Sequence, residues 1–401
     1  MMRAAPWLAL ALLLAAPLLL GSQALGLMVQ MGIAVVLCLS FWLLMGQGGM
    51  VSFGHALYSG LGAFAAIHML RTLQEATSGN LGGVPATLLI PVLPLAGGLA
   101  AAFMAWIFGW LATRHDSGTA FAMITLGLGE LVWAGAQMFP AIFGGEAGIS
   151  ADRSAGALPG RWNWGPVWQV YLLALVYTLA SAWLIYRYTL TPMGALLQAV
   201  RDKSQRVAFL GQDPRRIRHI SFVVAGFFAG VAGGLAALFN EIVSSEALSS
   251  QRSAAVLVFT LMGGLSTWVG PALGGVLMVL VTVVLSGWTQ AWLLYMGLAF
   301  MLVLLLLPRG LAPGLAQLYR AVQARPLASV LQALAVLAAA TGMGAALEMA
   351  YQIRLAPTVG SELAYLGMRL DAHAPADWLG SLAVALLGLG AWRWGAARVR
   401  R

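Results

Sequence analysis

One strongly basic stretch, 186–219, lies between two long apolar runs and constrains how the rest of the chain can be arranged. It holds seven of the 22 lysine and arginine residues, opposed only by Asp202 and Asp213. Because basic loops of membrane proteins stay in the cytoplasm, this stretch is expected to be a cytoplasmic loop that sets the orientation of the other segments. Its basic residues are Arg187, Arg201, Lys203, Arg206, Arg215, Arg216 and Arg218.

The same loop carries the signals of a short helix. Thr191 is predicted to cap its start, Pro192 to occupy the first helical position and Gly211 to end it. An apolar stripe with helical spacing runs along it, made of Met193, Leu196, Leu197 and Val200. A charged helix with such a stripe needs a partner surface. The alternative is a helix lying flat on lipid headgroups.

The composition identifies a membrane protein. Of the 401 residues, 61% are hydrophobic and 9% are charged, whereas about a quarter are charged in soluble proteins. The net charge of +9 therefore indicates topology and anionic headgroups rather than nucleic-acid binding. Lys203 is the only lysine and lies in no P-loop motif, so this chain is not expected to be its own ATPase of that type. The single cysteine, Cys38, excludes an internal disulfide.

We predict an all-α polytopic integral membrane protein with about ten core transmembrane segments plus two C-terminal ones, N-in and C-in. This threading places most arginines inside. The segment 253–286 either crosses twice or forms a re-entrant hairpin. Residues 1–26 form either an uncleaved first span, which we favour, or a cleavable signal peptide. The predicted spans are 7–20, 27–45, 53–70, 85–111, 118–139, 166–187, 217–240, 253–268, 271–286, 289–307, 327–350 and 378–396.

Two segments interrupted by glycine match each other loosely: GGMVSFGHALYSG at 48–60 and GGLSTWVGPALGG at 263–275. Paired broken segments in two halves of a chain indicate the pathway of a transporter. The alternative is that these glycines only serve close helix packing. The candidate hinge or pathway residues here are Gly49, Ser52, Gly54, His55, Gly264, Gly270 and Pro271.

Few ionisable side chains lie within the predicted spans: His55, His68, Glu130 and Glu348. Such groups are costly in a membrane, and each is a functional candidate. Glu130 lies mid-span and is expected to line a cavity or to bond to a neighbouring helix. His55 is expected to satisfy backbone carbonyls at the break, and the positions of His68 and Glu348 near span ends allow snorkelling. No metal-ligand spacing or nucleophile–base pair is visible, so we do not expect an enzyme.

Several motifs, in order, resemble the LivM-type permease subunits of branched-chain amino acid ABC transporters. They cover about 27–315, the expected permease domain, whose coupling loop is 188–216. Residues 316–401 form an extension with two spans that the resemblance does not reach. The motifs are GQGGMVSFGHALYSGLGAFAA (46–66), GTAFAMITLGLGELVW (118–133) with GGEAGI (144–149), the basic loop 193–237, GGLSTWVGPALGG (263–275) and LLLLPRGLAPGL (304–315).

The resemblance implies a heterodimer with a second permease subunit, two separate cytoplasmic ABC ATPases and a periplasmic or extracellular solute-binding protein. No cofactor would be bound by this chain, because the partner ATPases use the ATP. The loop would couple to the ATPases, and its apolar stripe would contact them. Ala195 and Ser204 depart from the family pattern. The coupling candidates are Gly194, Leu196, Leu197, Val200, Arg201, Asp202, Arg206 and Gly211.

The expected function is therefore a permease subunit of an ATP-driven importer for a small polar or zwitterionic solute, in a bacterial inner membrane. Branched-chain or other hydrophobic amino acids are the first expectation for the cargo. A permease for urea or short-chain amides is the alternative. A secondary transporter or channel that works by itself would need intramembrane charge for ion coupling, for which Glu130 is the only mid-span candidate.

Overall fold

The structure is a computed structural model, and its described part is helical apart from loops and two pairs of short strands. It divides into two compact units, Met1–Leu285 with Phe300–Ala312, and Ser286–Ala299 with Pro313–Arg401. The predicted spans at 7–20 and 327–350 lie partly outside the described residues. The described residues are 13–78, 89–114, 118–154, 163–307, 309–324, 341–350, 362–365, 368–371 and 374–399.

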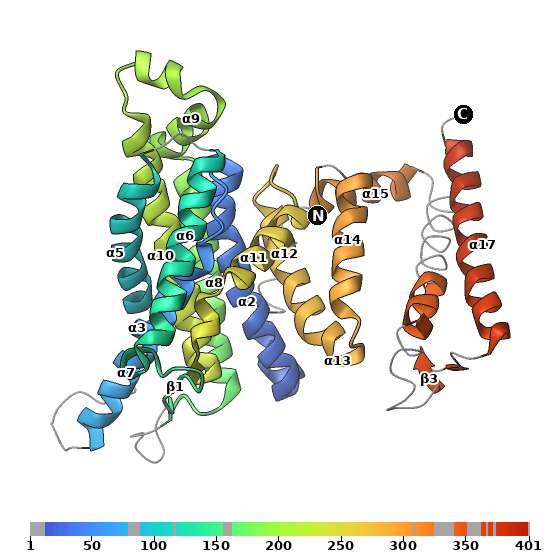
Figure 1. The fold of residues 1–401 in the computed structure, drawn as a ribbon, viewed down its shortest axis with the longest axis horizontal. Helices are drawn as coiled ribbons and strands as arrows, with labels where there is room; N and C mark the ends of the chain where they lie inside the picture. The colour runs from blue at the N-terminus through green and yellow to red at the C-terminus, as the bar shows by residue number, and fades with distance from the viewer. Residues whose placement is uncertain are drawn as a thin grey trace. The chain divides into compact units, whose positions relative to one another are not determined.

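Helix α9 lies at one end of the first unit, and α7 and β1 lie at the other (Figure 1). The helices of this unit are α2 (Ser22–Trp42), α3 (His55–Ser78), α5 (Leu93–Ala112), α6 (Thr119–Met138), α7 (Pro140–Phe143), α8 (Val167–Thr189), α9 (Pro192–Phe209), α10 (Pro214–Asn240), α11 (Ser250–Gly263) and α12 (Val269–Val279). Short π or 3-10 segments are η1 (Leu43–Gln47), η2 (Ile90–Val92), η3 (Ser245–Leu248) and η4 (Leu280–Leu285).

Six helical segments of the described chain are long and apolar enough to cross a membrane, and each overlaps a predicted span. This supports a polytopic membrane protein. The full count of ten plus two spans and the N-in, C-in topology remain predictions. The six segments are Ser22–Gln47, Ile90–Ala112, Thr119–Met138, Val167–Thr189, Pro214–Asn240 and Val269–Trp288, and shorter apolar helices are Trp292–Leu305 and Pro375–Leu387.

Helix α10 is the centre of the first unit, and it packs against α5, α3 and α2. Its sequence is apolar on almost every face, as expected for a helix surrounded by other helices. Glycines let the backbones approach: a Cβ at Gly62 of α3 would lie 2.5 Å from the Gly230 Cα of α10. A Cβ at Gly97 of α5 would lie 2.5 Å from the Gly62 carbonyl oxygen. Small residues at crossing points are the usual basis of helix association in membranes.

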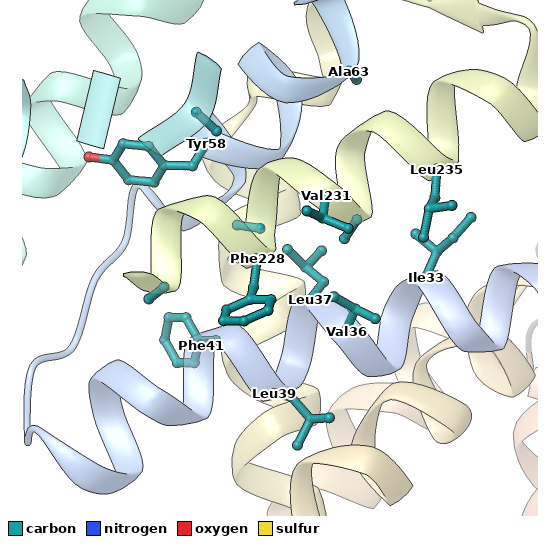
Figure 2. Close-up of a cluster of buried hydrophobic side chains, with 14 of the residues drawn as sticks. Ile33, Val36, Leu37, Leu39, Phe41, Tyr58, Ala63, Phe228, Val231 and Leu235 are labelled. Atoms are coloured by element: carbon teal, nitrogen blue, oxygen red, sulfur yellow. The ribbon is translucent and has the colours of Figure 1, made fainter. Parts of the chain in front are cut away.

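Larger apolar side chains fill the space between α2 and α10. Figure 2 shows Val36 and Leu37 of α2 pointing toward Phe228 and Val231 of α10, with all four side chains buried. Cys38 also lies buried in α2. This packing fixes α2, whose C-terminal end enters the first of the two glycine-rich breaks.

The region 253–286 contains two short helices, α11 and α12, which pack against each other and are joined by a turn at 264–268. An α11 of 14 residues is about 21 Å long, shorter than the roughly 30 Å of a bilayer core.

Two pairs of short strands were not predicted. In the first unit β1 (Ile149–Ser150) pairs antiparallel with β2 (Ile242–Val243).

The second unit contains α13 (Ser286–Trp288), parts of α14 (Trp292–Leu306) and α15 (Leu311–Ala324), a helix at 341–350 and α17 (Pro375–Val399). Its strands β3 (Glu362–Tyr365) and β4 (Met368–Asp371) form an antiparallel hairpin.

The expectation that Glu348 snorkels at a span end is wrong. Its side chain is buried, and its carboxylate accepts a 2.5 Å hydrogen bond from the Thr289 hydroxyl of the same unit.

Candidate functional site

The first glycine-rich segment is a true interruption of the helical backbone. Helix α2 continues as the π-helical turn η1, and the chain is not helical again until His55. Gly49 has a φ of +66°, a conformation that glycine adopts without the cost of a Cβ. A Cβ at Gly54 would overlap the carbonyl oxygen of Thr125 in α6. The glycines are thus required for backbone conformation at one position and for close approach at the other.

Three polar side chains are fully buried around this break: Ser40, Ser52 and His55. The His55 Nε2 lies 2.8 Å from the Ser40 hydroxyl oxygen. The expectation that His55 satisfies freed backbone carbonyls is therefore wrong, because its described partner is a hydroxyl. The His55 Nδ1 and the Ser52 hydroxyl are buried without a hydrogen-bond partner among the described residues.

Neighbouring helices satisfy the backbone donors that the break exposes. The Phe53 N–H donates to the Thr125 hydroxyl of α6 over 3.2 Å. The Ala56 N–H, in the first turn of α3, donates to the Ser253 hydroxyl of α11 over 2.9 Å. A helix start has no intrahelical acceptors for these groups, so hydroxyls from two other helices hold the break in place.

The second glycine-rich segment is a tight turn between α11 and α12. Gly264 has a φ of +109°, and a Cβ at Gly270 would overlap the Gly264 carbonyl oxygen. A Cβ at Gly274 would likewise overlap the carbonyl oxygen of Phe259. Pro271 is buried near the start of α12. The second glycine of each GG pair, Gly49 or Gly264, has a positive φ, which is a structural correspondence between the two matching segments.

Trp42 connects the two breaks. It is the last residue of α2, and its indole N–H donates a 2.9 Å hydrogen bond to the Leu265 carbonyl oxygen in the second break. A Cβ at Gly46 would overlap the Trp42 ring. The indole therefore fits between the π-helical turn of the first break and the backbone of the second.

Helix α9, predicted as the coupling helix, lies directly against the first break. The Arg201 guanidinium donates to the Gly46 carbonyl oxygen, and the Gln198 and Gln47 side-chain amides are hydrogen-bonded. A Cβ at Gly48 would lie 3.1 Å from Leu197 Cδ1, and a Cβ at Gly49 would lie 2.9 Å from Arg201 Cγ. The structure thus brings together two groups of candidate residues that are about 150 positions apart in the sequence.

The helix has the predicted ends. The Thr191 hydroxyl accepts a 3.3 Å hydrogen bond from the Gly194 N–H, Pro192 follows it, and Gly211 has a φ of +79°. The helix is not continuous, however, because Lys203 has non-helical backbone angles and introduces a kink. Gly194 is buried where the chain leaves α8, and a Cβ there would lie 2.6 Å from the Tyr188 carbonyl oxygen.

The expectation that the apolar stripe contacts a separate ATPase is wrong for its central residues. Leu197 is 0% exposed and Val200 is 2% exposed, and Leu196 is partly buried. They pack within this chain, because α9 contacts the first break, where Leu197 lies against Gly48, and also contacts α10. Of the coupling candidates, the exposed ones are Arg201, Asp202, Arg206 and Gly211, and the same end of the helix exposes Phe209 (89% exposed) and Leu210 (77% exposed).

Glu130 of α6 is half-buried, one position after Gly129, which approaches Gly54 at the first break. Its carboxylate makes no hydrogen bond or ion pair with another described residue. A helix–helix hydrogen bond, one of the two roles considered for it, is therefore not seen in the described part of the chain. Its role in the pathway remains a prediction, as do the roles of the coupling and hinge residues.

Sequence reasoning missed Arg153, which organises the opposite end of the first unit. Its guanidinium donates to the carbonyl oxygens of Leu238 and Phe239, 3.0 and 3.1 Å away at the end of α10. It also lies 3.4 Å from the Glu241 carboxylate. Beside it, hydrogen bonds from the hydroxyl and N–H of Ser154 lower the pKa of Asp152. A lone arginine in a long loop gives no sequence signal for this role, and neither does Trp42 at the end of an apolar run.

A family described as "Branched-chain amino acid transport system / permease component" matches residues 23–307. The high-affinity branched-chain amino acid transport system permease protein LivM of Escherichia coli K12 is 30% identical over 242 residues, 55% of this chain and 56% of the relative. The probable branched-chain amino acid transport permease protein LivM of Methanocaldococcus jannaschii is 28% identical over 189 residues, 43% of this chain and 53% of the relative.

The chain spans about half the length of the curated relatives it matches. No solved structure matches it. The family match covers both breaks, α9 and α10, which are the elements that form the candidate site. The chain therefore belongs to the family of permease components of branched-chain amino acid transport systems.

Proposed function

We propose that this protein is a membrane-spanning permease subunit of an ATP-driven importer. Its partners would be a second permease subunit, two cytoplasmic ABC ATPases and a solute-binding protein outside the membrane. The proposed cargo is a branched-chain or other hydrophobic amino acid, in keeping with the family description and the names of the relatives. The proposed location is a bacterial inner membrane, with α9 in the cytoplasm as its basic loop requires.

The observation that carries this proposal is the contact between α9 and the first break. Arg201 and Leu197 of α9 contact the π-helical turn and the residues that follow it. Trp42 then extends this contact to the second break at Leu265. A displacement of α9 by an ATPase would therefore reach both interrupted segments, which line the proposed pathway. Such a displacement is one way in which ATP binding drives alternating access.

The surface proposed for the ATPase is the exposed end of α9. Phe209 and Leu210 project into solvent beside the exposed side chain of Arg206. Fully burying each apolar side chain would contribute about 1.5–3 kcal/mol, offset by the costs of association. The rim charges would set the orientation and contribute little each. This surface replaces the buried stripe as the proposed contact.

The test is uptake of radiolabelled L-leucine by the assembled complex in proteoliposomes with its binding protein. We expect uptake that requires ATP inside, and competition by unlabelled isoleucine and valine but not by urea or acetamide. Competition by urea or acetamide alone would assign the permease to the alternative cargo class. Uptake by the permease without ATPases would support the secondary-transporter alternative instead.

A further inference from the structure

Two cavities lie on either side of one polar group in the first unit. The first has a volume of about 410 Å³ and lies between α2, α10, α11 and the α12–η4 segment. The second, of about 430 Å³, lies between α3, α10, β2 and α11. Both volumes are within the range of about 300–1,000 Å³ that is typical of small-molecule sites. The residues common to both linings are Ala236, Asn240, Glu246 and Arg252.

Arg252 is partly buried, and few groups of this chain compensate its charge. Its Nε is buried and has no hydrogen-bond partner among the described residues. Glu246 interacts with it electrostatically, but the two form no ion pair within hydrogen-bonding reach. Arg153, in the same unit, shows the contrast, because it has four carbonyl acceptors and a carboxylate. A partly buried guanidinium whose Nε has no such partner is suited to binding an anionic group that arrives with a ligand.

The polar end of the first cavity offers partners for both charges of an amino acid. The lining includes Ser249 and Gln251 at the N-terminus of α11, where backbone N–H groups and the helix dipole favour a carboxylate. It also includes Phe239 and Asn240 at the C-terminus of α10, where Arg153 already occupies the carbonyl oxygens of Leu238 and Phe239. The partners left for an ammonium group are therefore the Glu246 carboxylate and the Asn240 side-chain oxygen.

The rest of the first cavity is aliphatic. Ile33 and Leu37 of α2 form one wall, and Met278, Val279 and Val283 form another. A polar group at one end and an aliphatic wall at the other make up the lining expected for a small molecule with a charged head and a branched hydrocarbon tail.

We propose that the first cavity binds an amino acid with an aliphatic side chain as its zwitterion. Arg252 and the N-terminus of α11 bind the carboxylate, and Glu246 and the Asn240 side-chain oxygen bind the ammonium group. The aliphatic walls contact the side chain. The identity of the ligand as transport cargo rests on the proposed function, but occupancy of the cavity does not require transport.

The test uses the full chain with Gln251→Cys, an exposed position that lines the first cavity. The native Cys38 is buried, and the unsubstituted chain gives the background reaction with N-ethylmaleimide. L-leucine is expected to slow the labelling of the new cysteine. Leucinamide, which lacks the carboxylate, and 4-methylpentanoate, which lacks the ammonium group, are expected to leave the rate unchanged.

Arg252→Gln in the same background should raise the leucine concentration for half-protection about tenfold to a hundredfold, because a charge-assisted hydrogen bond is lost. Arg71→Gln is the matched control, because Arg71 is exposed, pairs with Glu75 and lines neither cavity; it should leave half-protection unchanged. Gln212→Cys, in an exposed turn after α9, should be labelled at the same rate with or without leucine. Should Arg252→Gln fail to assemble, the exposed Glu246→Gln provides the same comparison.

Unchanged labelling of Gln251→Cys in saturating leucine would overturn the site, as would equal protection in Arg252→Gln. These outcomes are separable from the proposed function. ATP-driven leucine uptake without protection would reject this cavity and leave the importer in place. Protection without uptake would keep the cavity and reject the importer.

Discussion

The two glycine-rich breaks are similar in sequence but are held by different interactions. The first is surrounded by polar side chains, including the Ser40–His55 pair, and by the contacts of α9. The second is mainly backbone against backbone: added Cβ atoms at Gly263, Gly270 and Gly274 would overlap carbonyl oxygens, whereas in the first break only Gly54 approaches a carbonyl oxygen this closely. The Ser40–His55 hydrogen bond can be exchanged while α9 and the first break move together, whereas the close backbone contacts of the second break leave no space for a movement. We infer that the first break rearranges and that the second acts as a fixed turn.

The largest effect is expected for Leu197→Asp, which removes the support of α9 on the first break. Leu197 is 0% exposed, so the change loses apolar burial and places a carboxyl group among apolar atoms, at a cost of about 3–5 kcal/mol. Thermal unfolding of the purified complex should shift to lower temperature. Leu210→Asp is the matched control at 77% exposure: it should leave unfolding unchanged and reduce retention of the ATPase. Equal unfolding of the two variants would contradict the packing of the stripe within this chain.

A smaller loss of stability is expected when a methyl group is added at the second break. Gly270→Ala would force the backbone away from Gly264, at a cost of about 1–3 kcal/mol. Gly127→Ala of α6 is the control, because nothing lies within 4 Å of its added Cβ. Unfolding temperature and leucine uptake of both variants are the measurements. If Gly270→Ala keeps the stability and uptake of Gly127→Ala, the fixed-turn interpretation is wrong.

The smallest effect is expected for Glu130→Gln, which removes a charge beside the first break and keeps most hydrogen-bonding capacity. Because Glu130 has no described partner within this chain, the unfolding temperature should not change. We expect the Glu130 carboxylate to face the pathway or the second permease subunit, because both positions keep it out of contact with lipid. Leucine uptake should then fall a few-fold in Glu130→Gln. Unchanged affinity and rate of leucine uptake in Glu130→Gln would show that the carboxylate has no role in the pathway.

Local features of this fold could be predicted from the sequence because local chemistry determines them. Thr191, Pro192 and Gly211 mark the ends of α9 as expected, and apolar runs mark the long helices. The apolar stripe on α9 predicted a face that is buried. The same pattern occurs whether the stripe packs against a partner protein or within the chain itself. The hydrogen bond from Trp42 to Leu265 joins residues 223 positions apart, and no local pattern carries such a contact. The kink at Lys203 likewise has no glycine or proline to signal it.

The most direct test of the central claim is a disulfide between α9 and the first break. Gln47 and Gln198 are hydrogen-bonded through their side chains, and Cys38 is buried and does not compete. The Gln47→Cys, Gln198→Cys double variant is oxidised in the assembled complex, and ATP-driven leucine uptake is measured before and after reduction. If α9 and the first break move as one body, the oxidised complex retains the uptake of the reduced one. Uptake that is abolished by oxidation and restored by reduction would show that α9 slides past the break, and would contradict this account.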